Sequence, residues 1–169
     1  MSTLGVADGK CIGSILNPEN QKIIWFISGT SQDVIAEYDQ STQQVEAILV
    51  DNHGGNPSFL NFTNEYLVTG INVIDGMLFW TDGNSEPKKI NIDRFSKGTD
   101  ASDPFTTTSK FVDASNVVTS NNVLEEDITV VKQYPLNAPS IDLFRDIAGT
   151  GDPSSCTVFT PENTTRTSW

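Results

Sequence analysis

The clearest structural signal in this chain is Met77-Leu78-Phe79-Trp80-Thr81, an apolar and aromatic run with a turn sequence on each side. Asp75-Gly76 precedes the run, and this dipeptide is favoured in two-residue β-hairpins. Asp82-Gly83-Asn84-Ser85 follows and leads to Lys89-Ile90-Asn91-Ile92, in which polar and apolar residues alternate. Because a period of two puts one face of a strand in the core and the other in solvent, the segment predicts antiparallel strands.

Similar runs occupy the chain on the N-terminal side of this segment. They are rich in β-branched and aromatic residues and are separated by Gly, Pro, Asn and Asp. The runs cover residues 23–28, 34–38, 45–50 and 68–74. No stretch of about 12 residues has helical periodicity, so we expect residues 1–95 to be all-β.

Two parts of the chain match each other when one is shifted by 54 positions. The shift aligns Trp25 with Phe79 and Phe26 with Trp80, and the match continues through the next turn and strand. The repeat motif consists of Trp25, Phe26, Gly29, Tyr38 and Asp39 in the first unit and Phe79, Trp80, Thr81, Asp82, Gly83, Ile92 and Asp93 in the second. Four-stranded units at such a period are typical of β-propeller blades. The alternative is a chance likeness between two antiparallel meanders.

The repeat predicts two antiparallel, blade-like four-stranded units, at about 9–52 and 60–95. They would form a partial β-propeller or a β-sandwich-like pair. A closed propeller needs about four to eight blades, so two blades cannot close a ring. We therefore expect the chain to be a piece of a longer protein or a subunit that completes its sheets with partners.

The remainder of the chain has a different composition. Residues 96–122 are rich in Thr, Ser, Asp and Asn and predict a polar loop with one strand at 110–113. Within 123–169 we expect a strand at 127–132, then a Pro-containing linker and an extended C-terminal tail. A short helix or a further strand could begin at Ser140.

Charge and composition disfavour two classes of partner. The 169-residue chain has 10 Lys and Arg against 22 Asp and Glu, a net charge of -12. A nucleic-acid binder needs a basic face, and an anionic membrane surface attracts basic segments, so we expect neither partner. No apolar run is long enough to span a membrane, and the first residues lack the pattern of a signal peptide. We expect a chain that stays in the cell that makes it or whose natural start differs.

The second unit carries a motif of a known family. Phe79-Trp80-Thr81-Asp82 resembles the YWTD motif of β-propellers found in lipoprotein-receptor ectodomains, with Phe79 in place of the leading Tyr. The first unit keeps only the aromatic pair, since Ile27-Ser28 stands where Thr-Asp would be. This resemblance implies a recognition module that binds a protein or a glycan on a propeller face.

A longer segment, residues 71–94, resembles part of the large structural proteins of tailed bacteriophages. The likeness continues at 127–132 and at 135–139, but those proteins are usually much longer, and residues 150–169 match nothing in them. The resemblance implies a virion structural protein of the tail or neck, made in the host cytoplasm and located in the virion. It implies partners among the other virion structural proteins, in a homo-oligomer or a hetero-assembly, and no enzymatic activity.

Two acidic segments are candidates for chemistry. Asp82-Gly83-Asn84-Ser85-Glu86 has oxygen ligands at alternate positions, as calcium loops do, but the other EF-hand ligands are absent. We expect a polar turn with Gly83 in a left-handed conformation and no metal or cofactor. Glu125-Glu126-Asp127 is the densest acidic cluster. Because adjacent residues do not face one cleft from opposite sides, we expect solvated charge there, and a propeller lyase or glycosidase is the least favoured function.

The remaining reactive side chains give little support to catalysis. His53 is the one histidine, lies in a polar Gly-rich segment and is expected to be solvated. No Gly-x-Ser-x-Gly sequence accompanies it, so a Ser-His-Asp triad is not indicated. Cys11 and Cys156 are expected to be unpaired thiols. We expect the aromatic pairs to fill a core rather than to stack on sugars.

Overall fold

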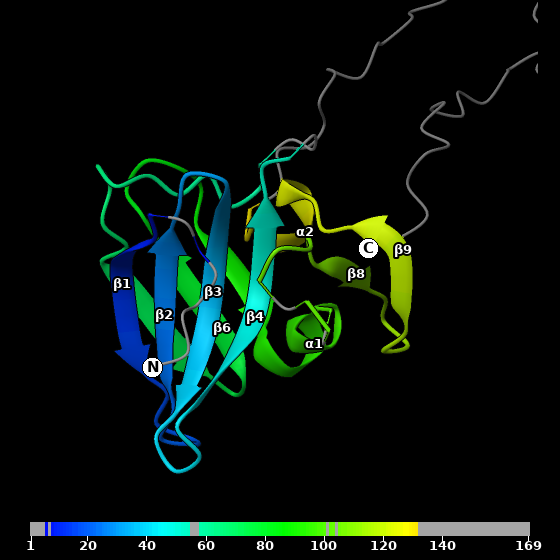
Figure 1. Ribbon diagram of the computed structural model, residues 1–169, viewed down its shortest axis with the longest axis horizontal. Coiled ribbons are helices and arrows are strands. Elements are labelled where there is room, and N and C mark those ends of the chain that lie inside the picture. The colour runs from blue at the N-terminus through cyan, green and yellow to red at the C-terminus, as the bar shows by residue number, and fades with distance from the viewer. Residues whose placement is uncertain (1–5, 7, 55–57, 101, 104, 132–169) are drawn as a thin grey trace, which may run out of the picture. The chain divides into compact units, whose positions relative to one another are not determined.

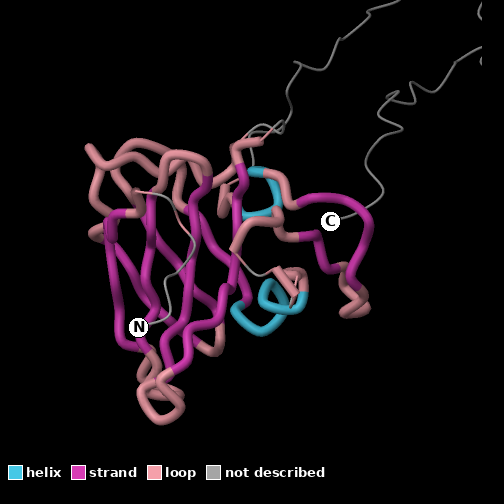
Figure 2. The backbone as a smooth tube through the Cα atoms, viewed as in Figure 1, coloured by secondary structure: helices cyan, strands magenta, loops and turns pink. Residues whose placement is uncertain are grey.

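The protein is described by a computed structural model, which covers residues 6, 8–54, 58–100, 102–103 and 105–131. Strands predominate in this part of the chain, as Figure 2 shows. No helix in the described part has the length and apolar character needed to cross a membrane. The predicted linker, the alternatives at Ser140, the C-terminal tail and Cys156 lie outside the described residues.

The first predicted unit forms a four-stranded antiparallel sheet. Its strands are β1 (Lys10–Leu16), β2 (Ile23–Ser28), β3 (Gln32–Asp39) and β4 (Gln44–Asn52), in the order β1-β2-β3-β4. Each strand pairs with the next one in the sequence, as a meander of short turns dictates. The four strands predicted for this unit are therefore confirmed.

The second unit is smaller than predicted. It contains β5 (Gly70–Ile74), β6 (Met77–Thr81) and β7 (Lys88–Asn91), which form a three-stranded antiparallel sheet. A two-stranded sheet of β8 (Lys110–Val112) and β9 (Val118–Asn122) follows. The expectation of one strand near 110–113 is confirmed, whereas the rest of 96–122 is not only a loop, because β9 pairs with β8.

Helix α1 (Ile92–Lys97) begins where the second unit was expected to continue as a strand. The Asn91 side chain accepts a hydrogen bond from the Arg94 backbone amide at 2.9 Å and so caps the first turn. Ile92 and Asp93 are therefore helical, while their repeat partners Tyr38 and Asp39 end a strand. The predicted match between the two units fails at this point because a side-chain cap replaces strand pairing.

Helix α2 (Glu125–Ile128) occupies the start of the strand predicted at 127–132. The Asp127 carboxylate accepts a hydrogen bond from the Leu124 amide at 2.9 Å, and the Thr129 amide donates to the Glu125 carbonyl at 3.1 Å. Over 127–131, the part of this stretch that the structure describes, only an isolated bridge between Thr129 and Lys88 has strand character. The prediction of a strand here is wrong because local capping and the burial of Ile128 favour a helical turn.

The four-stranded and three-stranded sheets pack face to face around one core, as Figure 1 shows. Ile24 and Phe26 of β2 face this core together with Leu78 and Trp80 of β6, and all four are buried. Helix α1 lies beside β4 and β8 and adds Phe95 to the same core. This two-layer packing matches the sandwich-like arrangement, the second of the two that the sequence predicts.

The opposite face of the four-stranded sheet is covered as well. Ile27, Val34, Ala36 and Val50 form a second buried cluster there, and Phe105 packs against it. Strand β3 is consequently buried on both faces over its first six residues, 32–37. Any polar side chain in that part of β3 must find its partners inside the protein.

Candidate functional site

Two aspartates lie directly opposite each other where β3 begins and β4 ends. Asp33 and Asp51 are register partners in this antiparallel pair. Their exposed fractions are 0% and 1%. Like charges in facing positions destabilise a sheet, and a buried carboxylate needs compensating hydrogen bonds or counter-charges. The hydrogen-bond donors and charged groups around the two carboxylates therefore determine which role the pair can have.

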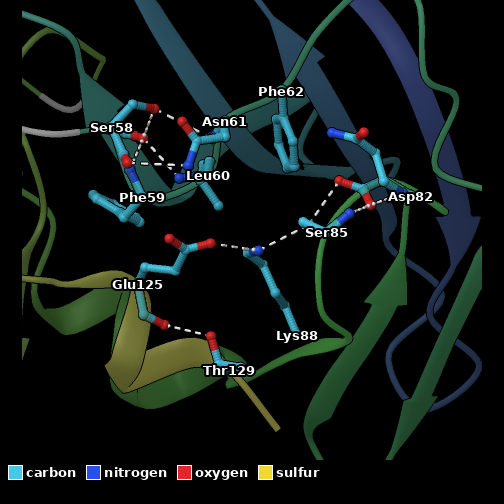
Figure 3. Close-up of polar contacts among 12 residues, drawn as sticks. Ser58, Phe59, Leu60, Asn61, Phe62, Asp82, Ser85, Lys88, Glu125 and Thr129 are labelled. Carbon is cyan, nitrogen blue, oxygen red and sulfur yellow. Dashed lines mark hydrogen bonds and ion pairs between the residues drawn. The ribbon is translucent and has the colours of Figure 1, made fainter. Parts of the chain in front are cut away.

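Asp51 holds the turn that follows the polar segment after β4. Its Oδ2 atom accepts hydrogen bonds from the Ser58 hydroxyl at 2.7 Å, the Phe59 amide at 2.7 Å and the Leu60 amide at 2.8 Å. Figure 3 shows the turn itself, in which Asn61 bonds back to Ser58. The other oxygen, Oδ1, is buried and has no hydrogen-bond partner among the described residues. The Oδ2 atom thus accepts three hydrogen bonds, while Oδ1 of the same carboxylate remains available to a ligand.

Asp33 accepts hydrogen bonds from the same turn and from the connection between β2 and β3. Its Oδ2 atom accepts a hydrogen bond from the Phe62 amide at 2.9 Å, and its Oδ1 atom accepts one from the Gly29 amide at 3.3 Å. His53 Nε2 lies 3.2 Å from Asp33 Oδ2. Burial raises the pKa of Asp33 above its usual value, although the Phe62 amide and His53 oppose that shift.

His53 completes the group immediately after β4. Its backbone amide donates to the Ser31 carbonyl at 3.0 Å, and its side chain is 30% exposed. The expectation that His53 is merely solvated is wrong, because the ring contacts the buried Asp33. Asp33, Asp51 and His53 each offer one ligand atom, and these atoms lie within 4.8 Å of one another. We call this group the Asp–His cluster.

The Asp–His cluster does not have the geometry of a Ser-His-Asp triad. The Ser58 hydroxyl contacts the cluster, but it donates to Asp51 rather than to His53. A nucleophilic serine must instead donate to the imidazole that deprotonates it. What the cluster does offer is two carboxylates and one imidazole converging from β3, β4 and the segment after β4, which are ligand types for a cation.

The aromatic residues of the repeat motif occupy two kinds of position. Phe26 and Trp80 fill the core between the sheets, as expected. The Trp80 indole nitrogen is buried without a hydrogen-bond partner among the described residues. Trp25 stacks on Tyr38 with ring centroids 5.4 Å apart on the other face of the sheet, and Phe79 is partly buried. The expectation that these rings fill a core is therefore confirmed for the inner pair.

The turn expected at Asp82 is present. Asp82 Oδ1 accepts hydrogen bonds from the Asn84 and Ser85 amides at 2.9 and 2.8 Å, and Oδ2 accepts one from the Ser85 hydroxyl. Gly83 has φ +74, the left-handed conformation that was predicted. In the first unit Asp39 makes comparable bonds to Ser41. Asp82 and Asp39 are thus engaged in organising their own turns.

The remaining motif residues, Gly29, Thr81, Ile92 and Asp93, do not converge on one site. Gly29 donates to Asp33, Thr81 is exposed at the end of β6, and Ile92 and Asp93 begin α1. The repeat motif therefore describes folding positions spread over both sheets. The Asp–His cluster, in contrast, contains none of the motif residues.

The acidic segment at α2 is only partly solvated. Glu125 lies 3.0 Å from the Nζ atom of Lys88, which is 1% exposed and also donates to the Ser85 hydroxyl at 2.9 Å (Figure 3). Asp127 bonds to the helix start, and Glu126 is exposed. The expectation of solvated charge is therefore confirmed for Glu126 and for Glu125, which is 45% exposed although it also neutralises a buried lysine, whereas Asp127 caps α2.

Comparison with protein-family models, curated proteins and solved structures finds no match to this chain. The resemblances to YWTD propellers and to phage structural proteins therefore remain predictions from the residues that carry them.

Proposed function

We propose that this chain is a structural component of a tailed-phage virion, in the tail or neck, and that it acts through protein–protein assembly. The proposal rests on the resemblance of residues 71–94 to phage structural proteins. In the fold, this segment corresponds to β5, β6, β7 and the start of α1, which form one layer of the sandwich. The function proposed is assembly and not catalysis.

The free edge of β9 supports this proposal more than any other structural feature. β9 is one strand of a two-stranded sheet, and no further described strand pairs with its outer edge. Val117, Val118 and Leu124 lie in or beside β9 and are exposed by 58%, 46% and 51%. An unpaired strand edge with apolar neighbours is a template on which another chain can add a strand. The partner we propose is another virion structural protein or a second copy of this chain.

The charge of the chain fits the same role. A net charge of -12 keeps free subunits apart in solution before they assemble. The two-layer core provides a rigid body, so partner contacts order only the edge rather than the whole domain. Assembly would then proceed by docking of a preformed sandwich.

The proposal is tested by charging this edge. Val117→Lys in the phage that encodes the chain should lower its incorporation into particles about tenfold, the effect of about 1.4 kcal/mol of lost contact free energy. Leu67→Lys is the matched control, because Leu67 is exposed by 59% and adjoins Val68, whose amide donates to Ile12 of β1 rather than to β9. Incorporation is measured by mass spectrometry of purified particles. Equal incorporation of both variants and the wild type would contradict the role given to β9.

A further inference from the structure

The Asp–His cluster has the spacing of a single-ion site. His53 Nε2 and Asp33 Oδ2 lie 3.2 Å apart. Two ligand atoms that each lie about 2.0–2.1 Å from one ion are separated by about 2.8–3.4 Å in octahedral or tetrahedral coordination. The distance between these two atoms is thus compatible with both atoms binding one shared ion, as well as with a hydrogen bond between them. One ligand atom from each of Asp33, Asp51 and His53 lies within 4.8 Å of the other two, so a small rotation of the partly exposed His53 ring can bring all three onto one ion.

An independent observation comes from Asp51 itself. The side chain is 1% exposed, and its Oδ1 atom has no hydrogen-bond partner among the described residues. A buried carboxylate oxygen without a partner is unfavourable, because it has lost its hydrogen bonds to water and no protein donor replaces them. The Oδ2 atom of the same carboxylate is fixed by three donors from the 58–60 turn. Asp51 is therefore held in place with one oxygen free for a ligand.

From these observations we propose that Asp33, Asp51 and His53 bind one Zn²⁺ ion. The cluster combines one imidazole nitrogen with two carboxylate oxygens. Ca²⁺ and Mg²⁺ take oxygen ligands, whereas imidazole suits Zn²⁺ and its neighbours in the transition series. Three protein ligands leave the fourth position of a tetrahedral Zn²⁺ to water, as in sites open to solvent, and His53 is 30% exposed on that side.

The ion would join parts of the chain that are distant in sequence. Asp33 begins β3 and Asp51 ends β4, and the same two carboxylates hold the turn at 58–62 through Phe59, Leu60 and Phe62. A divalent charge at this point neutralises both buried aspartates, which removes their repulsion. A bound Zn²⁺ would thus link the turn at 58–62 to the sheet where β3 begins and β4 ends.

The experiment detects zinc binding through the NMR signals of His53, the single histidine of the chain. The full chain is prepared without a polyhistidine tag and with Cys11→Ser and Cys156→Ser, so that no thiolate competes for zinc. Zn²⁺ is titrated near pH 7.5 while the ¹⁵N signals of the His53 ring are recorded, and calorimetry measures affinity and stoichiometry. We expect one ion per chain and a shift of the Nε2 signal on saturation.

Two variants separate this site from adventitious binding. His53→Gln and Asp51→Asn should each weaken Zn²⁺ binding tenfold or more, whereas Asp39→Asn, which removes a carboxylate from another turn, should leave it unchanged. His53→Gln alters a partly exposed side chain, so circular dichroism serves to verify that the fold is retained. The proposal is overturned if Zn²⁺ leaves the His53 ring signals unchanged, or if both variants bind it as tightly as the parent chain.

Discussion

The Phe26 and Trp80 rings meet edge to face between the two sheets, with centroids 5.6 Å apart and an interplanar angle of 60°. These two residues occupy equivalent positions of the 54-residue repeat. Blades of a propeller follow one another by rotation about a central axis, so one face of a blade meets the opposite face of the next and equivalent residues do not touch. Contact between equivalent residues is instead the geometry of two sheets facing each other in a sandwich.

Truncation of Phe26 should expose how much this contact contributes to stability. Phe26 is fully buried, so Phe26→Ala should lower the free energy of unfolding by about 3–5 kcal/mol. Phe79→Ala is the matched control, since Phe79 lies on the other face of its strand and is only partly buried. Phe79→Ala should lower the free energy of unfolding by clearly less than Phe26→Ala does. Urea unfolding followed by fluorescence measures both, and equal losses would argue against a core shared by the two sheets.

The turn at 58–60 should depend on the acceptor oxygen of Asp51 more than on its charge. Asp51→Ala leaves the buried Phe59 and Leu60 amides without an acceptor, at a cost of about 2–5 kcal/mol in metal-free buffer. Asp51→Asn keeps an acceptor oxygen and removes a charge facing Asp33, so it should cost much less. Urea unfolding gives the two values, and amide hydrogen exchange at Leu60 gives the local effect. A smaller loss for Asp51→Ala than for Asp51→Asn would refute this account of the turn.

The turn at Asp82 should make stability depend on acid pH. Partial burial raises the pKa of Asp82, but hydrogen bonds from Ser85 and Asn84 and the charge of Lys88 outweigh it, so the pKa lies below its ordinary value of 3.8. A carboxyl with a lowered folded-state pKa stabilises the protein above the unfolded-state pKa and loses that contribution as pH falls through the folded-state value.

Asp82→Asn should therefore lower the melting temperature near pH 7, and the difference from the wild type should shrink below about pH 4. Scanning calorimetry from pH 2.5 to 7 measures this difference. Glu65→Gln removes an equal charge from an exposed position and serves as the control. A difference for Asp82→Asn that stays constant over this range would show that the carboxylate charge does not stabilise the turn.

The strands of the first sheet and the centre of the second were predictable because their information is local. Residues 23–28 and 77–81 carry β-branched and aromatic side chains between turn residues, and the structure places strands there. Strand β9 was not predictable in this way, because its sequence Val118-Thr-Ser-Asn-Asn lacks apolar alternation. Its pairing with β8 comes from the hairpin that precedes it.

Helix α2 shows that the composition of a short segment does not by itself predict its secondary structure. Residues 127–132 are rich in β-branched residues, which favours a strand. The outcome depends instead on Asp127 capping the Leu124 amide and on Ile128 entering the core between the sheets. Packing of this kind is a tertiary effect that a short window of sequence does not contain.

The Asp–His cluster escaped prediction for a related reason. Asp33 and Asp51 flank apolar runs, where aspartate ordinarily marks a turn. They become partners only through the register of β3 and β4, which includes an irregularity between Ile35 and Ala36. The one available signal was their position near the two ends of a single hairpin. Asp33 is buried on the side of the 58–62 turn, where the Phe62 amide donates to its carboxylate and Phe62 itself belongs to the core between the sheets, a contact that no local window of sequence contains.

The most direct test of the proposed function is quantitative mass spectrometry of gradient-purified tailed-phage particles produced from the genome that encodes this chain. The account predicts that the chain is present in intact particles and that its ratio to the major structural proteins stays constant through successive purification steps. Absence of the chain from intact particles, or a ratio that falls with each step toward zero, would contradict a role in virion assembly.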